Sequence, residues 1–452
     1  MHPLVLPALA APGLAALVLL AQDSRPADDT LTQAELEEMT AAILEDIEEL
    51  RGTAYTREVR VSIADKAGFL SYVDERVDRM TTPAKLRAEE TVLKVFGLID
   101  PEVDYLAAQM ELLESQVGGF YDPATESFAL MDSFQGGLAK IILAHELTHA
   151  LDDQLYDIDG TLDRLDGNAD AQLAYQAVVE GSGTGLMNKW MLANLGTEVT
   201  AADLAGAGEM DTAGLAEAPA AMWKPMMMVY LRGASFLVRS DNVMVGQMGN
   251  IDPDDLHRAF TEPPRSSEQV LHPEKYWGEG DELDEPTLLR LDTAALEHAG
   301  WTRLHADTLG EASLALVTAP ASERGGLDAS NPMALLGMRY TNAAAEGWDG
   351  DRYVILEKDG GLFFFLASVW DSDPDAAEFA ANLAGQQADL DARHRSLAAH
   401  LAGEGAEPRV EGWAGTAGPY HHVAYAVNAP GGATIGELVG GVRVLAELPL
   451  PR

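Results

Sequence analysis

The chain of 452 residues contains no cysteine. This absence excludes a disulfide scaffold, a thiolate zinc site and a catalytic thiol. Basic residues are also scarce, because 30 Lys and Arg stand against 73 Asp and Glu, which gives a formal net charge of −43. A surface this acidic repels phosphate backbones, so we expect no nucleic-acid partner.

Lysine is the rarer of the two basic residues, with 8 Lys against 22 Arg. Low lysine with abundant acid is typical of proteins from salt-rich habitats, whose acidic surfaces remain hydrated. A GC-rich genome, which favours Ala, Gly, Arg and Asp, gives the same composition. Hydrophobic residues make up 47% of the chain, so a packed core is expected despite the charge.

Long hydrophobic runs are absent except at the N-terminus. Residues 4–21 are uncharged and apolar and precede the polar sequence QDSRPADDT, which predicts that residues 1–21 form a signal peptide. An uncleaved N-terminal anchor is the alternative, although Pro7 and Pro12 disfavour a well-formed membrane span. We expect an exported bacterial protein, in the periplasm, cell envelope or medium, with no stable membrane span after processing.

The rest of the chain divides into three segments. Residues 22–56 are an acidic segment in which residues 30–51 predict an amphipathic helix, with Thr32 and Glu35 as a capping box at its start and Gly52 as its stop. Residues 57–285 alternate between strand and helix patterns. Residues 286–452, which follow a polar linker, carry another mixture, with helices and with predicted strands at 352–358, 361–370, 421–428 and 443–448. The predicted fold class is α+β, with one main domain in 57–285 and a C-terminal α+β domain of unknown role.

One motif in the main domain carries chemistry. His145, Glu146 and His149 form the pattern H-E-x-x-H inside a predicted helix over 137–155. Residues four apart lie on the same side of a helix, so both imidazoles can reach one metal ion, while Glu146 can project toward a water beside that ion. Apolar residues at helical spacing turn this face toward the core. The motif therefore predicts a single zinc ion held by two histidines.

A catalytic zinc ion needs a third protein ligand. Glu180 lies next to the apolar run Ala177–Val179 on a predicted helix over 170–190, which Asp170 is expected to cap. An inward-facing carboxylate in such a run requires a cation, so Glu180 is the predicted third ligand. The alternative is an ordinary glutamate on an amphipathic helix.

Two neighbouring segments have no assigned chemistry. The acidic segment 157–169 is predicted to be a solvated loop between the two helices. The methionine-rich segment 221–238 is predicted to be a buried helix, because methionine at this density usually fills a core.

These residues resemble the active-site helix and ligand set of the gluzincins, the zinc peptidases that combine H-E-x-x-H with a downstream glutamate. The resemblance implies a zincin-like catalytic domain that hydrolyses peptide bonds in a peptide or protein substrate. His145, His149 and Glu180 would bind one zinc ion, and Glu146 would be the general base. The resemblance is close over 57–285 and looser over 286–452. The matching segments of the main domain are 115–130, 145–154, 178–181, 229–236 and 266–277.

The resemblance also implies supporting roles. Asp153 would orient a ligand histidine. His272 or Tyr276 would donate a hydrogen bond to the oxyanion of the reaction, with Tyr121 as a weaker alternative. The chain departs from the expected pattern at Ser182, where an Asp would stand two residues after the ligand Glu.

A predicted hairpin strand over 116–121 precedes the motif. In gluzincin architecture such an edge strand binds the substrate backbone as an added strand. The residues assigned to this role are Gly118, Gly119, Phe120 and Tyr121, and the two glycines would let a peptide approach closely. A plain hairpin is the alternative.

A second functional interpretation is a catalytically silent protein that keeps zinc for structure and binds peptides or acts at the cell envelope. The presence of Glu146 favours hydrolysis, because a structural zinc site has no use for that acid. The sequence does not separate endopeptidase from exopeptidase activity.

Overall fold

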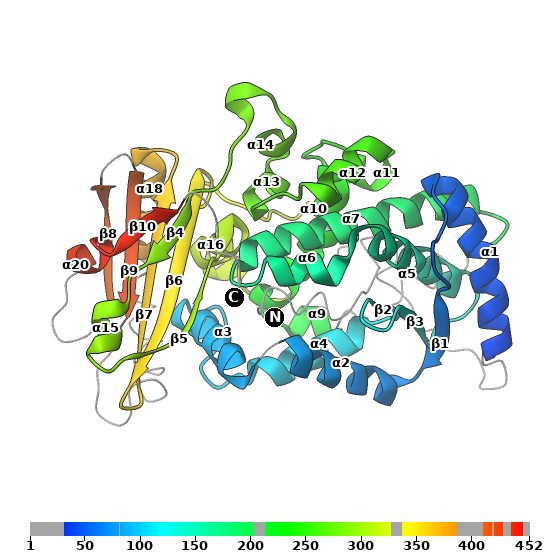
Figure 1. Cartoon of the computed structure of the whole chain (residues 1–452), viewed down its shortest axis with the longest axis horizontal. Coiled ribbons are helices and arrows are strands. Elements are labelled where there is room, and N and C mark those ends of the chain that lie inside the picture. The colour runs from blue at the N-terminus through cyan, green and yellow to red at the C-terminus, as the bar shows by residue number, and fades with distance from the viewer. Residues whose placement is uncertain are drawn as a thin grey trace.

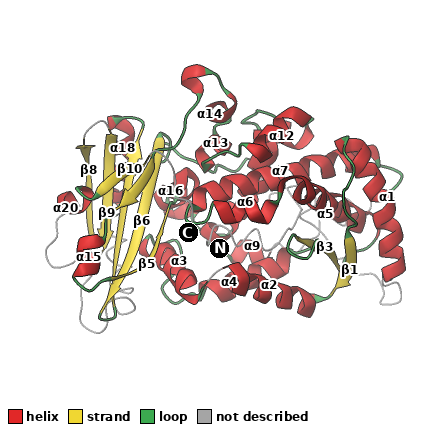
Figure 2. Ribbon diagram, viewed as in Figure 1, coloured by secondary structure: helices red, strands yellow, loops and turns green. Residues whose placement is uncertain are grey.

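The computed structural model describes residues 31–80, 82–201, 203, 213–326, 337–386, 410–417, 420–427 and 435–445. The predicted signal peptide lies outside these residues. The α+β class is confirmed, because a mainly helical half adjoins a C-terminal half built on an antiparallel sheet (Figure 1, Figure 2). Within the described residues, none of the helices has the length and apolar character that a membrane crossing needs.

Helix α1 (Gln33–Arg51) begins and ends where the sequence predicts. The Thr32 side chain accepts a hydrogen bond from the Glu35 amide, and the Glu35 carboxylate accepts one from the Thr32 amide, which completes the capping box. Gly52 ends the helix in the left-handed region at φ 71°, where glycine avoids the strain of a Cβ. The apolar face of α1 lies in the same hydrophobic cluster as the H-E-x-x-H helix, so this helix is part of the main domain's core.

A three-stranded sheet lies beside that core in the order β1-β3-β2. Strand β1 (Arg60–Ala64) runs parallel to β3 (Ser127–Met131), and β2 (Gly119–Asp122) pairs antiparallel with β3 as the predicted hairpin. The turn closes through the Thr125 amide, which donates to the Asp122 carbonyl at 3.2 Å. In this order β2 is at one edge of the sheet, yet all four of its residues are buried.

Two long helices run through the centre of the helical half (Figure 1). Helix α5 (Gly136–Tyr156) carries H-E-x-x-H, and α7 (Ala169–Ala193) carries Glu180. The sequence predicts a loop between them, but this segment contains the short helix α6 (Ile158–Arg164). The Asp157 carboxylate accepts a hydrogen bond from the Gly160 amide and so caps this helix.

Helix α10 (Ala220–Leu237) packs along α7. This helix contains the methionine-rich segment, which is buried as predicted. The other elements of the helical half are α2 (Lys66–Met80), α3 (Pro83–Val95), α4 (Tyr105–Gln116), α9 (Ala213–Glu217), α11 (Val243–Met248), α12 (Pro253–Thr261), α13 (Ser267–Leu271), α14 (Glu274–Trp277) and η2 (Gly280–Glu282).

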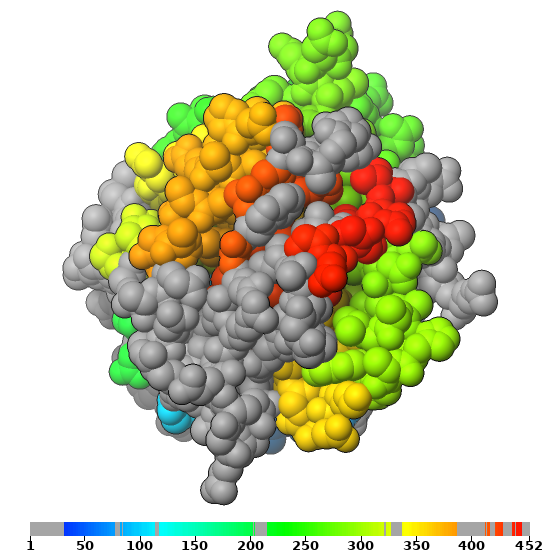
Figure 3. Space-filling model, turned by 90° about the vertical axis from the view of Figure 1, so that its left-hand side faces the viewer, coloured from blue at the N-terminus to red at the C-terminus, as the bar shows by residue number. Residues whose placement is uncertain are grey.

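The C-terminal half contains a five-stranded antiparallel sheet in the order β5-β6-β7-β9-β8. Successive residues of a strand face opposite sides of a sheet. Phe364 accordingly joins the core shared with the helical half, whereas Phe363 and Phe365 join a smaller cluster on the other face. Figure 3 looks onto this end of the molecule, where the red segment of α20 and β10 lies beside the light-green segment of β4 and α15.

The elements of this half include the two predicted strands at 352–358 and 361–370, which are found as β6 and β7. Their bounds and those of the other elements are β4 (Leu288–Leu291), α15 (Ala294–His298), β5 (Thr302–Asp307), α16 (Gly310–Thr318), η3 (Ala321–Glu323), β6 (Trp348–Lys358), β7 (Gly361–Trp370), α18 (Asp373–Gly385), β8 (Val410–Ala417), β9 (Tyr420–Val427), α20 (Ile435–Val439) and β10 (Val442–Leu445).

Buried polar contacts join the two halves at the start of α7. The Asp307 carboxylate at the end of β5 accepts a hydrogen bond from the Ala169 amide at 2.8 Å. The sequence predicts Asp170 as the N-cap of α7, but the N-cap is Asn168. The Asp170 carboxylate instead accepts a hydrogen bond from the Ser267 amide at 3.0 Å. The C-terminal half therefore supplies a hydrogen-bond acceptor to the helix that carries Glu180.

Candidate metal centre

His145, His149 and Glu180 converge in the interior, where α5 packs on α7. The Nε2 atoms of the two histidines are 2.7 Å apart, and Glu180 Oε2 lies 3.2 Å from His145 Nε2 and 3.3 Å from His149 Nε2. All three residues are buried. The structure thus brings the three predicted ligands together from two different helices.

This set of atoms fits a zinc ion. Two imidazole nitrogens and one carboxylate oxygen form a donor set that zinc prefers, and a zinc ion with three protein ligands keeps one position open. The donor atoms lie within 4.8 Å of one another, so one ion can contact all three. A cation also explains why a carboxylate is buried between two imidazoles, since burying an uncompensated charge is costly.

The three side chains shift one another's pKa values, and a bound metal ion would take the place of the proton that His149 holds. Burial lowers the pKa of His145, and the charge of His149 lowers it further. Burial acts to lower the pKa of His149 as well, but the Glu180 carboxylate outweighs it and raises that pKa. The two histidines in turn hold the pKa of Glu180 below its usual value, against the effect of burial. Glu180 is therefore ionised, as a metal ligand must be.

Gly183 makes room for both imidazoles. A Cβ at this position of α7 would lie 2.7 Å from His145 Cε1 and 2.9 Å from His149 Cε1. The sequence alone predicts no role for this glycine. The spacing could have indicated a role, because a residue three positions after Glu180 lies on the same face of a helix.

Glu146 and Tyr230 complete the buried surroundings. Glu146 is fully buried, and its charge contributes to the raised pKa of His149. The ring centroid of Tyr230, on α10, lies 6.1 Å from that of His145. Burial and then the charges of Glu180 and Glu146 raise the pKa of Tyr230 well above its usual value. A phenol in this state keeps its proton and can donate a hydrogen bond.

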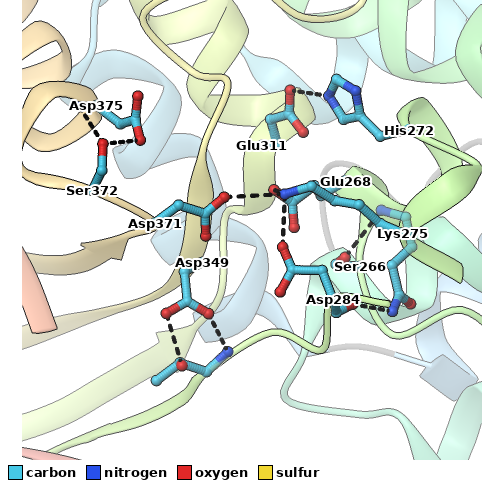
Figure 4. Close-up of polar contacts among 12 residues, drawn as sticks. Ser266, Glu268, His272, Lys275, Asp284, Glu311, Asp349, Asp371, Ser372 and Asp375 are labelled. Atoms are coloured by element: carbon cyan, nitrogen blue, oxygen red, sulfur yellow. Dashed lines mark hydrogen bonds and ion pairs between the residues drawn. The ribbon is translucent and has the colours of Figure 1, made fainter. Parts of the chain in front are cut away.

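The structure does not bring His272 and Tyr276 to the metal centre. His272 Nε2 pairs with Glu311 Oε1 at 3.0 Å in the contact region between the two halves (Figure 4). The Tyr276 hydroxyl donates to the Glu262 carbonyl at 2.7 Å. Tyr230, which the sequence predicts only as part of a buried helix, is a tyrosine whose ring lies near His145.

The carboxylate of Asp153 accepts hydrogen bonds from Tyr121 and Ile158 rather than from a ligand histidine. Its Oδ2 accepts from the Tyr121 hydroxyl and its Oδ1 from the Ile158 amide, both at 3.0 Å. Asp153 therefore ties the hairpin to the end of α5. The same contact commits the Tyr121 hydroxyl to a carboxylate.

The charge of the neighbouring Asp152 is one of several that raise the pKa of His149, after those of Glu180 and Glu146. Ser182 Oγ donates to Asp152 at 2.6 Å, and Arg51 of α1 binds the same carboxylate at 2.5 Å. The gluzincin pattern leads us to expect an Asp at position 182. This chain has Ser182 there, and its hydroxyl donates a hydrogen bond to Asp152, an acid of α5.

Gly119 of the predicted substrate strand has a packing role. A Cβ on Gly119 would lie 2.7 Å from the Phe128 ring and 3.0 Å from Ile142 of α5. Phe120 stacks on Tyr72 with ring centroids 4.3 Å apart. A glycine is needed at position 119 because the hairpin packs closely on its neighbours, and no approaching peptide is required to explain it.

A cavity of about 50 Å³ adjoins the metal centre and is lined by His149, Glu180 and Tyr121, among others. A wider groove of about 750 Å³ shares Pro123 and Asp159 with this cavity. Both spaces therefore lie against the hairpin turn that contains Pro123.

A second group of three acids lies where the two halves meet (Figure 4). Glu268, Asp284 and Asp371 all contact the ammonium group of Lys275, at 2.5, 2.7 and 3.2 Å. The chain itself therefore provides the cation at the centre of this group.

Comparison with known proteins gives one match. A family model described as a domain of unknown function (DUF8575) matches residues 299–428, which lie in the C-terminal half and do not include α5 or α7. No curated protein and no solved structure matches the chain. The family match therefore says nothing of the residues of the candidate metal centre.

Proposed function

We propose that the chain is a zinc-dependent peptidase of gluzincin type with a zincin-like catalytic domain. The observation that supports this proposal is the convergence of His145, His149 and Glu180 in a buried centre beside Glu146. Three protein ligands are typical of catalytic zinc, whereas structural zinc usually has four. An acid beside the ligands is what a hydrolytic site requires.

The residues of the chain then divide the reaction between them. A zinc ion held by the three ligands would supply Lewis-acid polarisation of the scissile carbonyl and activation of water. Glu146 accepts the proton of the attacking water and delivers it to the nitrogen of the leaving amine as the C–N bond breaks. The Tyr230 hydroxyl donates a hydrogen bond to the carbonyl oxygen as that oxygen becomes negative. Both interactions are strengthened by the burial of the site.

Zinc content and casein cleavage test the proposal. Wild-type protein should bind about one zinc ion per chain and cleave casein. Glu146→Gln should retain the zinc and lose cleavage by about 10² to 10⁴-fold. Glu180→Ala should lose the zinc. If wild type and Glu146→Gln both retain zinc, and neither cleaves casein or other protein substrates, the result would instead support the silent peptide-binding protein.

Tyr230 is tested separately. Removal of one oxyanion donor typically lowers kcat by about 10² to 10³-fold, so Tyr230→Phe should lower kcat with little change in KM or zinc content. His272→Gln should leave kcat near the wild-type value, because His272 contacts Glu311 at the meeting of the two halves.

Export to the periplasm, cell envelope or medium remains part of the proposal. Mass spectrometry of the exported protein should find a mature chain that begins near Gln22. A mature chain that still begins at Met1 would contradict cleavage and favour the anchor.

A further inference from the structure

The cavity beside the metal centre contains polar side chains that the proposed reaction does not use. Arg76 of α2 and Gln176 of α7 line it together with His149 and Glu180. Arg76 and Gln176 are each only 3% exposed. Gln176 precedes Glu180 by one helical turn, so the two residues share a face of α7.

Three polar atoms of these two side chains are unsatisfied. Within the described part of the chain, neither Nε2 nor Oε1 of Gln176 has a hydrogen-bond partner, and neither has Nε of Arg76. Buried polar atoms in folded proteins are nearly always hydrogen-bonded. An unused acceptor and unused donors in one cavity therefore point to a ligand group with both a donor and an acceptor.

The charges around Arg76 indicate that this group is neutral. Asp159 accepts hydrogen bonds from both terminal nitrogens of Arg76, at 2.8 and 2.6 Å, and Asp122 lies 3.4 Å from one of them. The guanidinium charge is thus already balanced by two carboxylates. A third carboxylate would therefore be repelled by the two acids, and an ammonium group has no atom that could accept a hydrogen bond from Arg76 Nε.

The size of the cavity limits the ligand further. A volume of about 50 Å³ holds only a few water-sized sites. A carboxamide fits both this size and the available atoms. Its oxygen can accept from Arg76 Nε and Gln176 Nε2, and its NH₂ group can donate to Gln176 Oε1.

We propose that this cavity is a specificity subsite for the side-chain carboxamide of an Asn or Gln residue next to the scissile bond. The inference rests on the proposed peptidase function, because it places the subsite beside the reacting bond. Gln176 and Arg76 are specificity residues in this scheme and take no part in proton transfer.

Cleavage-site analysis of a peptide library by mass spectrometry tests the subsite. Zinc-loaded wild type should show Asn or Gln enriched at one position beside the cleaved bond. For a matched pair of peptides, Gln176→Leu should lower the ratio of kcat/KM for the Asn peptide to kcat/KM for the Leu peptide by about tenfold or more, because it removes the buried donor and acceptor. Gln172→Leu is the matched control, since Gln172 lies one turn earlier on α7 and is not among the residues that line the cavity.

A binding measurement separates this inference from the proposed function. Zinc-loaded Glu146→Gln protein should bind a blocked tripeptide Ala-Asn-Ala more tightly than Ala-Asp-Ala or Ala-Leu-Ala, and Gln176→Leu added to it should abolish the preference. A wild type that cleaves no peptide would defeat the peptidase proposal, and equal binding of the three tripeptides would still overturn the subsite. Cleavage with the same residue preference in wild type and Gln176→Leu would overturn the subsite alone.

Discussion

Gly181 and Gly233 lie against each other where α7 crosses α10. A Cβ on Gly181 would lie 2.4 Å from the carbonyl carbon of Gly233, and a Cβ on Gly233 would lie 2.0 Å from the carbonyl oxygen of Ala177. Backbone atoms cannot turn aside as a side chain can, so only glycine fits. This contact fixes the separation of the two helices beside Glu180 and Tyr230, which come from opposite sides of the crossing.

Gly233→Ala is therefore expected to destabilise the protein. Overpacking of this kind costs about 1–3 kcal/mol, which exceeds the gain of about 1 kcal/mol from the better helix propensity of alanine. Urea unfolding monitored by circular dichroism measures the change. Gly385→Ala is the control, because a Cβ on Gly385 of α18 meets no atom within 4 Å. Equal unfolding midpoints for the two variants would contradict the close crossing.

Gly183→Ala should separate metal binding from folding. The added methyl group would displace both imidazole rings, and such changes around a metal site typically cost about 10 to 100-fold in affinity. Calorimetric titration with zinc measures this loss, and circular dichroism should show the same helix content as the wild type. Gly185→Ala is the control, because its methyl group would meet only the flexible end of Ile251. Unchanged zinc affinity in Gly183→Ala would mean that the rings do not bind the ion from their present positions.

Asp170 predicts a pH dependence of stability. Burial raises its pKa to about 8, helped by the charges of Asp351 and Glu311 and opposed by hydrogen bonds from Ser267. The unfolded chain releases this proton near pH 3.8. The folded state therefore binds more protons between these two values, and the contribution of Asp170 to stability is lost as the pH rises from about 4 to 8.

The variant Asp170→Asn removes this titration. Its unfolding free energy relative to the wild type should increase from pH 5 to pH 8, by at most about 1.4 kcal/mol per pH unit. Urea unfolding at several pH values provides the comparison. Asp74→Asn, at an exposed position of α2, should give a difference from the wild type that does not vary with pH. A difference that decreases with pH for Asp170→Asn would contradict a raised pKa.

Lys275 is expected to hold the two halves together. Its ammonium group contacts Glu268, which is 1% exposed, and Asp371, which belongs to the C-terminal half. Lys275→Met leaves Glu268 buried without its cation, which should destabilise the protein by about 3 kcal/mol. The double variant Lys275→Met, Glu268→Gln should recover most of this loss in urea unfolding. A double variant less stable than the single one would contradict the pairing.

The sequence predicts best those features that depend on neighbouring residues. The capping box of Thr32 and Glu35 fixes the start of α1, and the spacing of His145 and His149 fixes a shared helix face. The order of the strands in the C-terminal sheet depends on pairing between distant segments, which a local pattern does not contain. Strands β5 and β8 were missed for this reason.

The sequence predicts less well which neighbours a side chain meets. Asp152 and Asp153 are adjacent, yet on a helix adjacent residues point about 100° apart, and only the packing of α1 and α7 shows that Asp152 acts on His149. Tyr230 was missed because a tyrosine that faces a buried metal centre and one that fills a core both lie in apolar helices. Gln176 was missed for the same reason.

The contact between Asp307 and the start of α7 has a consequence for the synthesis of the protein. Glu180 leaves the ribosome well before Asp307 does, so α7 lacks this acceptor until β5 has been synthesised. The metal centre would therefore gain its full support only when the C-terminal half has folded.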